Sequence, residues 1–216
     1  MEKVDGRTAR KLRSHAKILD AAARLLRERG QEGVSVDELM AAAGLTRGGF
    51  YAHFRGKTAL VASALDYAFA QQRARLFGDD PNLHGRELLT RALHRYLSRE
   101  HLETPGLGCP APALATDMAR SDPAVRAVFE RNMKRVVGIF HERGEMPLET
   151  AMVVCALAVG AVTLARGMED ERFADALLAA ARHHLAALDG PARAPRARPS
   201  KRPAPKKTAK RRTAKR

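Results

Sequence analysis

The chain of 216 residues is 45% hydrophobic and 29% charged, with a formal net charge of +15, which describes a soluble protein of one large or two small domains. Two cysteines, Cys109 and Cys155, are too few and too far apart for a disulfide framework, and no signal-peptide pattern follows Met1. The longest uncharged stretch, residues 150–165, is shorter than the ~20 residues of a membrane-spanning helix, so we expect a cytoplasmic protein without a membrane partner.

The positive charge is concentrated at the two ends of the chain. Residues 191–216 carry seven arginines and five lysines with no acidic residue, whereas residues 1–60 have a net charge of +5 and residues 61–190 a net charge of −2. A basic head and tail around a near-neutral body favour an acidic polymer as partner, and double-stranded DNA is the simplest candidate.

The first predicted helix covers residues 8–29. Its apolar residues recur at helical spacing on one face, and Gly30 supplies the C-terminal stop. The basic residues of its opening turns are interpreted as an ordinary solvated face. Because alternating strand patterns are scarce throughout the chain, we predict an all-α fold.

A helix-turn-helix is predicted between residue 34 and about residue 53. Ser35 and Glu38 have the spacing of a capping box, in which the two residues satisfy each other's backbone amides. Gly44 is suited to a left-handed C-cap, and Thr46 offers a new N-cap only two residues later. Two short helices joined by a tight glycine turn are typical of this motif.

The second of these helices, from Arg47 to about His53, is the candidate for the DNA major groove. Gly48 and Gly49 lack side chains, so the backbone can approach bases and phosphates, at a cost of about 1 kcal/mol of helix propensity each. Arg47 is placed to reach a base edge, and Tyr51 and His53 are placed to reach phosphates.

The aromatic residues around this helix predict how it is held. Phe50 and Phe54 lie four residues apart and share one face, which would pack against the body of the protein. Lys57 starts the next helix, where free amides and the helix dipole also favour a phosphate. A plain helical hairpin with core aromatics would explain neither the paired glycines nor the polar residues among the aromatics.

The stretch GVSVDELMAAAGLTRGGFYAHFRGKTALVASAL resembles the DNA-binding domain of the TetR family of transcriptional repressors. The resemblance covers residues 14–65 and rests on the Ser-x-x-Glu box, the Ala-Gly-Leu-Thr turn and the Phe-Tyr-x-His-Phe-x-x-Lys run. It implies an all-helical two-domain homodimer that binds a near-palindromic operator. It also implies that the DNA contacts are made by Ser35, Thr46, Arg47, Tyr51, His53 and Lys57.

The rest of the chain continues the helical pattern. Helices are predicted near residues 57–77, 85–103, 110–119, 123–143, 148–167 and 172–188. We expect three regions with about nine helices in all: a three-helix DNA-binding domain at 1–56, a helical ligand-binding and dimerisation domain at 57–190, and a Lys/Arg/Pro/Ala-rich tail at 191–216. The tail has nothing with which to build a core, so disorder is expected there.

By the same resemblance, the body binds an inducer and forms the dimer through the helices near 148–167 and 172–188. The ligand pocket is expected among the body helices, with possible lining by Phe69, Phe77, Tyr96, Cys109, Met118, Phe129 and Met133. The histidines show no metal spacing, and no nucleophile–base pair or phosphate loop occurs. We therefore predict no cofactor, no metal and no enzyme activity.

Cys109 allows two interpretations. It precedes Pro110, which suits the first position of a helix, so its thiol would cap a helix whose dipole favours the reactive thiolate. The resemblance also extends to a branch of the family in which some members sense electrophiles or oxidants through a cysteine. A lone cysteine is more often buried and inert, and no basic residue precedes Arg120 in this helix, so we favour the inert interpretation.

These patterns favour a transcriptional regulator, and specifically a repressor that a small-molecule or electrophile inducer releases from its operator. Two alternatives stay open: a nucleoid-associated protein that coats DNA through its basic tail, and a thiol redox sensor that acts through Cys109. The sequence identifies neither the inducer nor the operator, and it leaves activation open beside repression.

Overall fold

The computed structural model of the chain describes residues 6–78, 80 and 82–188, and every regular element in this part is helical. The predicted basic tail at 191–216 lies outside the described residues. The elements, in chain order, are α1 (Gly6–Arg29), α2 (Val36–Ala42), the 3₁₀ helix η1 (Arg47–Ala52), α3 (Lys57–Phe77), α4 (Gly85–Tyr96), α5 (Arg99–Glu103), the 3₁₀ helix η2 (Pro105–Leu107), α6 (Ala111–Met118), α7 (Pro123–Glu142), α8 (Leu148–Arg166) and α9 (Glu171–Ala187). The predicted all-α fold is confirmed.

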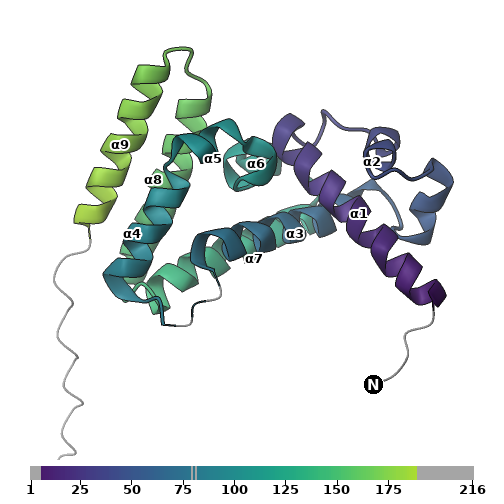
Figure 1. The fold of residues 1–216 in the computed structure, drawn as a ribbon, viewed down its shortest axis with the longest axis horizontal. Helices are drawn as coiled ribbons and strands as arrows, with labels where there is room; N and C mark the ends of the chain where they lie inside the picture. The colour runs from purple at the N-terminus through teal and green to yellow at the C-terminus, as the bar shows by residue number, and fades with distance from the viewer. Residues whose placement is uncertain (1–5, 79, 81, 189–216) are drawn as a thin grey trace, which may run out of the picture.

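The molecule has two ends, which α3 and α7 join (Figure 1). At one end α1 crosses α3 and packs against α2, which in turn contacts η1. At the other end α4, α8 and α9 lie side by side, and α7 runs along both α3 and α8. The buried side chains form one continuous core from Ile18 in α1 to Leu185 in α9, so α3 belongs to the packing of both ends.

Two predicted helices differ from the structure. The single helix expected at 85–103 is divided, because Leu97 leaves the helical region at φ −96° and ψ 53°. Ser98 then starts α5, and its hydroxyl accepts a hydrogen bond from the His101 amide. The helix expected from Arg47 to about His53 is a 3₁₀ helix, since a six-residue segment with paired glycines makes i to i+3 backbone bonds in place of α-helical ones.

Candidate nucleic-acid interface and buried cavity

The α2–η1 unit is built by local hydrogen bonds that the sequence predicted. The Ser35 hydroxyl accepts from the Glu38 amide at 3.2 Å, and the Ser35 amide donates to Glu38 Oε2 at 2.8 Å, so the capping box is present. These bonds from Ser35 lower the pKa of the Glu38 carboxyl. Gly44 has φ +68°, the left-handed conformation that ends α2 and turns the chain toward η1.

The cap expected from Thr46 is the exception. Thr46 precedes η1 with an extended backbone, but its side chain makes no capping hydrogen bond. A 3₁₀ helix this short has few free amides within reach of the preceding hydroxyl, and the Thr46 carbonyl accepts the first backbone bond, from Gly49. The Thr46 side chain is exposed and free for another partner.

Buried and exposed aromatic residues alternate along η1. Phe50 and Phe54 are 2% and 6% exposed, and their rings stack with centroids 5.9 Å apart. Tyr51, between them, is 73% exposed and meets only the edge of Phe50. The phenylalanines therefore fix η1 on the core while the tyrosine hydroxyl faces solvent.

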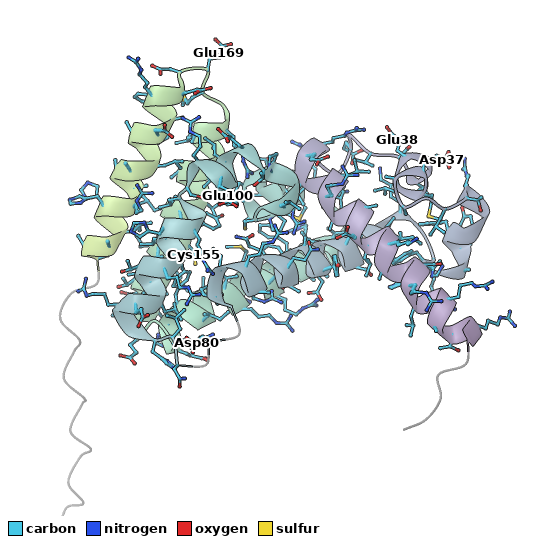
Figure 2. All side chains as sticks on the ribbon, in the orientation of Figure 1. Asp37, Glu38, Asp80, Glu100, Cys155 and Glu169 are labelled. Carbon is cyan, nitrogen blue, oxygen red and sulfur yellow. The ribbon has the colours of Figure 1, made fainter. Side chains whose placement is uncertain are left out.

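The polar residues beside Tyr51 are also accessible. Arg47 is exposed and pairs with the Asp37 carboxylate of α2 at 2.7 Å, and Asp37 and Glu38 lie together at the outer side of α2 (Figure 2). A Cβ added to Gly48 would meet nothing within 4 Å. Ser35 is exposed as well, and Lys57 is half-buried at the start of α3.

A second histidine, which the sequence analysis missed, contacts the expected phosphate-binding residue His53. The His15 ring of α1 stacks on Phe54 at 4.8 Å and lies 5.7 Å from the His53 ring. Burial, followed by the neighbouring His15 and Lys11, lowers the pKa of His53, so its ring is neutral near pH 7. His15 continues the apolar stripe of α1 one turn before Ile18 and Leu19, which is the signal that could have placed it here.

A buried arginine joins the η1 end to the body. Arg27 of α1 is 3% exposed, and its guanidinium donates to the carbonyls of Ala68 in α3 at 2.8 Å and Gly106 in η2 at 3.0 Å. Desolvation lowers the pKa of Arg27 to about 10, so the group stays charged at neutral pH. A Cβ on Gly106 would stand 2.4 Å from Glu28 Oε1 and 2.9 Å from Arg24 Cγ, so a larger residue would require these two side chains of α1 to shift. No local sequence signal distinguishes Arg27 from the exposed arginines of the same helix.

The body contains a small apolar cavity of about 40 Å³ between α3, α4, α7 and α8. Its lining residues are Phe69, Gln72, Arg73, Leu76, Ala92, Leu93, Tyr96, Cys109, Met133, Val136, Phe140, Val154, Cys155, Ala158 and Val159. Four predicted pocket residues, Phe69, Tyr96, Cys109 and Met133, are thus brought together.

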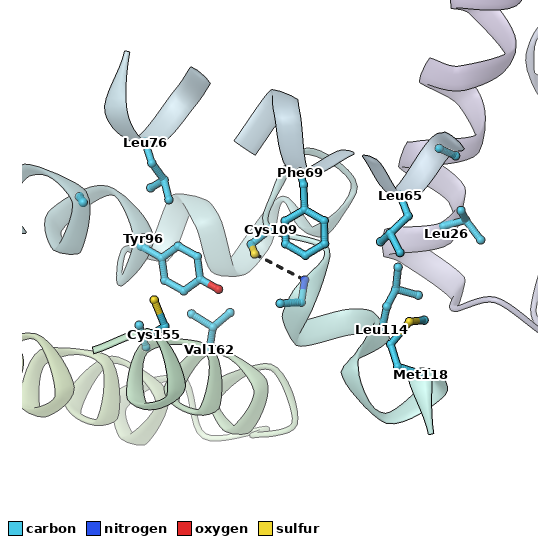
Figure 3. Close-up of a cluster of buried hydrophobic side chains, with 14 of the residues drawn as sticks. Leu26, Leu65, Phe69, Leu76, Tyr96, Cys109, Leu114, Met118, Cys155 and Val162 are labelled. Atoms are coloured by element: carbon cyan, nitrogen blue, oxygen red, sulfur yellow. Dashed lines mark hydrogen bonds between the residues drawn. The ribbon is translucent and has the colours of Figure 1, made fainter. Parts of the chain in front are cut away.

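The other three predicted pocket residues lie elsewhere. Phe77 packs edge-on against Phe140 at 5.4 Å, and Phe129 packs edge-on against Phe69 at 5.7 Å, so each supports a lining ring from behind. Met118 is buried at the end of α6, away from the cavity (Figure 3). Helical spacing marked all three as inward-facing and could not distinguish the cavity wall from the layer behind it.

His101, which bonds to Tyr96 and Cys109 of the cavity wall, is held in an uncharged form, whereas the guanidinium of Arg73 on the wall donates to Asn132 Oδ1 at 2.6 Å. His101 is buried, its Nδ1 donates to the Tyr96 carbonyl at 2.6 Å, and its Nε2 accepts from the Cys109 amide at 2.9 Å. Desolvation lowers the pKa of His101 to about 4. Burial likewise raises the pKa of the Tyr96 hydroxyl, which has no hydrogen-bond partner in the described part of the chain.

Both cysteines line this cavity as buried free thiols (Figure 3). Helix α6 begins at Ala111, one residue later than predicted, and the Ala111 amide donates to Cys109 Sγ at 3.4 Å. Burial is the dominant influence and raises the pKa of Cys109, which opposes the expected helix-dipole effect. Burial also raises the pKa of Cys155 to about 12. Burial therefore favours the protonated thiol at both positions, and the inert interpretation of Cys109 stays a prediction.

Helices α8 and α9 expose a broad apolar surface. Its largest exposed side chains are Leu148, Met152, Val153, Leu157, Leu164, Phe173 and Leu188. Among the described helices, α8 is the one long and apolar enough to cross a membrane, but its other face packs in the core on α6, α7 and α9. Within residues 6–78, 80 and 82–188, no group of three or more His, Cys, Asp or Glu side chains could hold a metal ion.

The η1 end matches a known sequence family. Residues 18–64 match the family described as bacterial regulatory proteins, tetR family. The chain is also 28% identical over 167 residues to an uncharacterised HTH-type transcriptional regulator of Mycobacterium tuberculosis, an alignment that covers 71% of this chain and 84% of that protein.

Solved structures share the whole helical arrangement. A TetR-family transcriptional regulator from Cytophaga hutchinsonii aligns with a TM-score of 0.68 at 21% identity, over 83% of this chain and 96% of that one. The reduced form of E. coli NemR aligns with a TM-score of 0.67 at 22% identity, over 80% and 94% of the two chains. At these identities the likeness supports the fold, with the helix-turn-helix at one end and the helical body at the other.

Proposed function

We propose that this chain, which belongs to the TetR family of transcriptional regulators, represses transcription as a homodimer on a two-fold symmetric operator and is released when a small molecule enters the buried cavity. The observation that carries the proposal is the exposure pattern of η1. Phe50 of η1 and Phe54, which follows it, are buried, whereas Tyr51 and Arg47 project into solvent beside Gly48, which has open space around it. That arrangement presents a short backbone segment and its polar side chains to a DNA groove.

The proposed DNA contacts divide by their chemistry. Arg47 would leave the Asp37 carboxylate for a base edge, so its guanidinium has hydrogen-bond acceptors in both states. Ser35, Thr46, Tyr51, His53 and Lys57 would contact phosphates and so set the position of η1 on the duplex. Asp37 would hold the Arg47 side chain near its bound position in the free protein.

The proposed dimer uses the exposed apolar surface of α8 and α9. Leu157 of α8 and Phe173 of α9 are 43% and 55% exposed. Exposure of this apolar area to water is unfavourable, and a second subunit would cover it. Pairing of α8 and α9 with the same helices of a partner would make a four-helix interface about a two-fold axis. Such a dimer presents two η1 segments to successive major grooves.

Release would follow from the contacts that connect the cavity to α1. Cys109 and Tyr96 line the cavity and are bridged by His101, and the chain between His101 and Cys109 includes Gly106, which binds Arg27 of α1. A ligand that moves the cavity wall would shift η2 against α1, and α3 would carry the same displacement directly. The spacing of the two η1 segments would then no longer fit the operator.

The two alternatives have less support. An electrophile that entered the cavity would meet both Cys109 and Cys155, but both thiols are buried and protonated, which slows their reaction. DNA coating by the basic tail would not need the buried phenylalanines and exposed polar groups of η1. We place the protein in the cytoplasm, in contact with the nucleoid.

The test is DNase footprinting of the full-length chain on the DNA upstream of its own gene and on a genomic fragment pool, at near-physiological salt with excess competitor DNA. A discrete two-fold symmetric footprint that disappears with Arg47→Ala and persists with Arg126→Ala, an exposed arginine on α7, is expected. Binding to every fragment without a footprint, equal in both variants, would replace the repressor with the DNA-coating protein. Truncation after residue 190 then measures what the tail adds to non-specific affinity.

A further inference from the structure

Two polar side chains of the cavity wall lack a strong hydrogen-bond partner among the described residues. Gln72 of α3 is only 5% exposed, and its carboxamide makes no hydrogen bond to any described residue. The Tyr96 hydroxyl is enclosed beside the Cys109 thiol, which is a weak hydrogen-bonding group (Figure 3). An enclosed donor without a good acceptor is costly and uncommon, so the Tyr96 hydroxyl points to a ligand with a polar atom, and the Gln72 carboxamide offers a second polar contact beside it.

Gln72 also lies between the cavity and a groove at the surface. Gln72 and Leu76 line the cavity and, in addition, an open groove of about 450 Å³ between α3, the end of α4, α5 and η2. The remaining groove residues include Arg75, Arg95 and His101. The groove and the cavity therefore adjoin at Gln72 and Leu76, and a molecule that moved these two side chains apart would lie in both at once.

The groove is cationic where the cavity is apolar. The Arg75 guanidinium donates to the Leu107 carbonyl, and Arg95 donates to the Arg75 carbonyl at 2.7 Å. No carboxylate of the described chain lies within ion-pair distance of either arginine, unlike Arg99, which pairs with Asp175. Glu100 is the one acidic residue of the groove, and His101 is neutral because both ring nitrogens are held by backbone groups.

From this juxtaposition we infer that the groove and the cavity form a single site for an amphipathic carboxylate. Its apolar chain occupies the cavity, its carboxylate lies in the groove at Arg75 and Arg95, and Gln72 donates a hydrogen bond at the neck. Charge-assisted bonds from two guanidiniums suit a carboxylate. The cavity suits an apolar chain, because its lining is mostly apolar and its one charged side chain, Arg73, donates to Asn132. The inference rests on the proposed function and names the chemistry of its inducer.

The size of the cavity makes chain length informative. About 40 Å³ accommodates only a few carbon atoms, so a longer chain must displace side chains such as Leu76 and Met133. Leu76 belongs to α3, which packs on α1, and the groove wall at Leu107 and Gly108 adjoins the η2 contact with Arg27. Longer chains therefore bind with a larger displacement of the very contacts that lead to η1.

The experiment is isothermal titration of the full-length protein with hexanoate, decanoate and 1-decanol. Decanoate is expected to bind about tenfold more tightly than 1-decanol, which corresponds to one charge-assisted hydrogen bond. Arg75→Gln and Arg95→Gln are each expected to remove most of that difference and to leave 1-decanol binding unchanged. The matched control is Arg91→Gln, one turn earlier on α4 and outside this groove, which should change neither affinity.

A second variant tests the cavity half of the site. Ala158→Leu adds three carbon atoms to the cavity wall from α8 and is expected to weaken decanoate and 1-decanol alike. Equal affinity for acid and alcohol in the wild type, or decanoate binding that survives both Ala158→Leu and the arginine variants, would overturn the inference. Titration needs no DNA, so a negative result there leaves an operator footprint intact, whereas a missing footprint removes the proposed function without affecting the titration.

Discussion

Tyr51 and Tyr96 place the same side chain in opposite environments at the two ends of the molecule. Tyr51, on η1, is 73% exposed and its hydroxyl is solvated, whereas Tyr96, at the cavity, is 7% exposed and its hydroxyl has no partner among the described residues. The Tyr51 hydroxyl, proposed to contact DNA, is thus separate from the packing that holds η1. The Tyr96 hydroxyl at the cavity is part of the core, so ligand binding and stability are coupled there.

The largest effect is expected from the residue that holds η1 in place. Phe50→Ala empties a site that is 2% exposed and stacked on Phe54, so the free energy of unfolding should fall by about 3–5 kcal/mol. Chemical denaturation of the purified protein measures it. Tyr51→Ala is the matched control, because it removes an exposed ring from the next position and should change stability by less than about 1 kcal/mol while it abolishes the footprint. Equal destabilisation by both variants would show that Tyr51, like Phe50, is needed to hold η1 in place.

A second large effect should appear on acidification, and it belongs to the cavity end. The pKa of His101 is about 4 in the folded protein and near 6.5 when unfolded, so between these values the unfolded chain binds the proton first. The contribution of neutral His101 to the free energy of unfolding is therefore fully present above about pH 6.5. It falls by about 3 kcal/mol as the pH drops toward 4. Denaturation midpoints across this range in wild type and His101→Gln measure the contribution as a difference in slope.

The comparison for this prediction is the half-buried imidazole of His53. The lowered pKa of His53 acts in the same direction, so His53→Gln should reduce the slope as well, by an amount that adds to that of His101→Gln. The carboxylates with lowered pKa values, such as Asp66 and Asp175, also stabilise the folded protein. Their contribution is lost only toward the acid end of the range, where they become protonated. A slope that His101→Gln leaves unchanged would show that His101 is accessible to protons in the folded state.

The elements fixed by neighbouring residues could be predicted from the sequence. The capping box of Ser35 and Glu38, the left-handed Gly44 and the full span of α3 each depend on chemistry within a few positions. The same holds for the burial of Phe50 and Phe54, which follows from their spacing. Family resemblance strengthened these predictions, because the motif lies in one contiguous stretch.

What could not be predicted depends on residues that are distant in sequence. Arg27 is buried because carbonyls 41 and 79 residues away accept its hydrogen bonds. Gln72 lines both the cavity and the groove because α4, α5 and η2 lie opposite this face of α3, and no helical pattern in the sequence encodes that arrangement. The division of 85–103 at Leu97 and the 3₁₀ form of η1 were missed for a different reason: propensity rules favour a helix in both places and do not resolve its length or type.

An intermediate effect is expected where the two ends meet. Arg27→Met keeps the apolar stem but removes the donors to Ala68 and Gly106, so two buried carbonyls lose partners and the free energy of unfolding should fall by about 1–3 kcal/mol. Arg24→Met, three residues earlier, breaks only an exposed ion pair with Glu28 and should change stability by less than about 1 kcal/mol. If the α1–η2 contact couples the ends, Arg27→Met should also weaken the response of the operator footprint to ligand, which Arg24→Met should not.

The smallest change in stability is expected from Gly48→Ala, and it isolates DNA contact most cleanly. A methyl group at Gly48 would meet no atom within 4 Å, and the backbone there has no positive φ, so the folded protein accommodates it without strain. Alanine also restricts the unfolded chain, so stability should rise by up to about 1 kcal/mol. Operator affinity should nevertheless fall, because the methyl group would occupy the space in which the η1 backbone approaches the duplex.

Fluorescence anisotropy on the footprinted site measures the operator affinity. The control is Ala52→Gly, at the exposed end of η1, which shows how far a change in backbone flexibility alone alters that affinity. Unchanged affinity with Gly48→Ala would mean that η1 touches DNA through its side chains only, and that the paired glycines serve some purpose other than close approach.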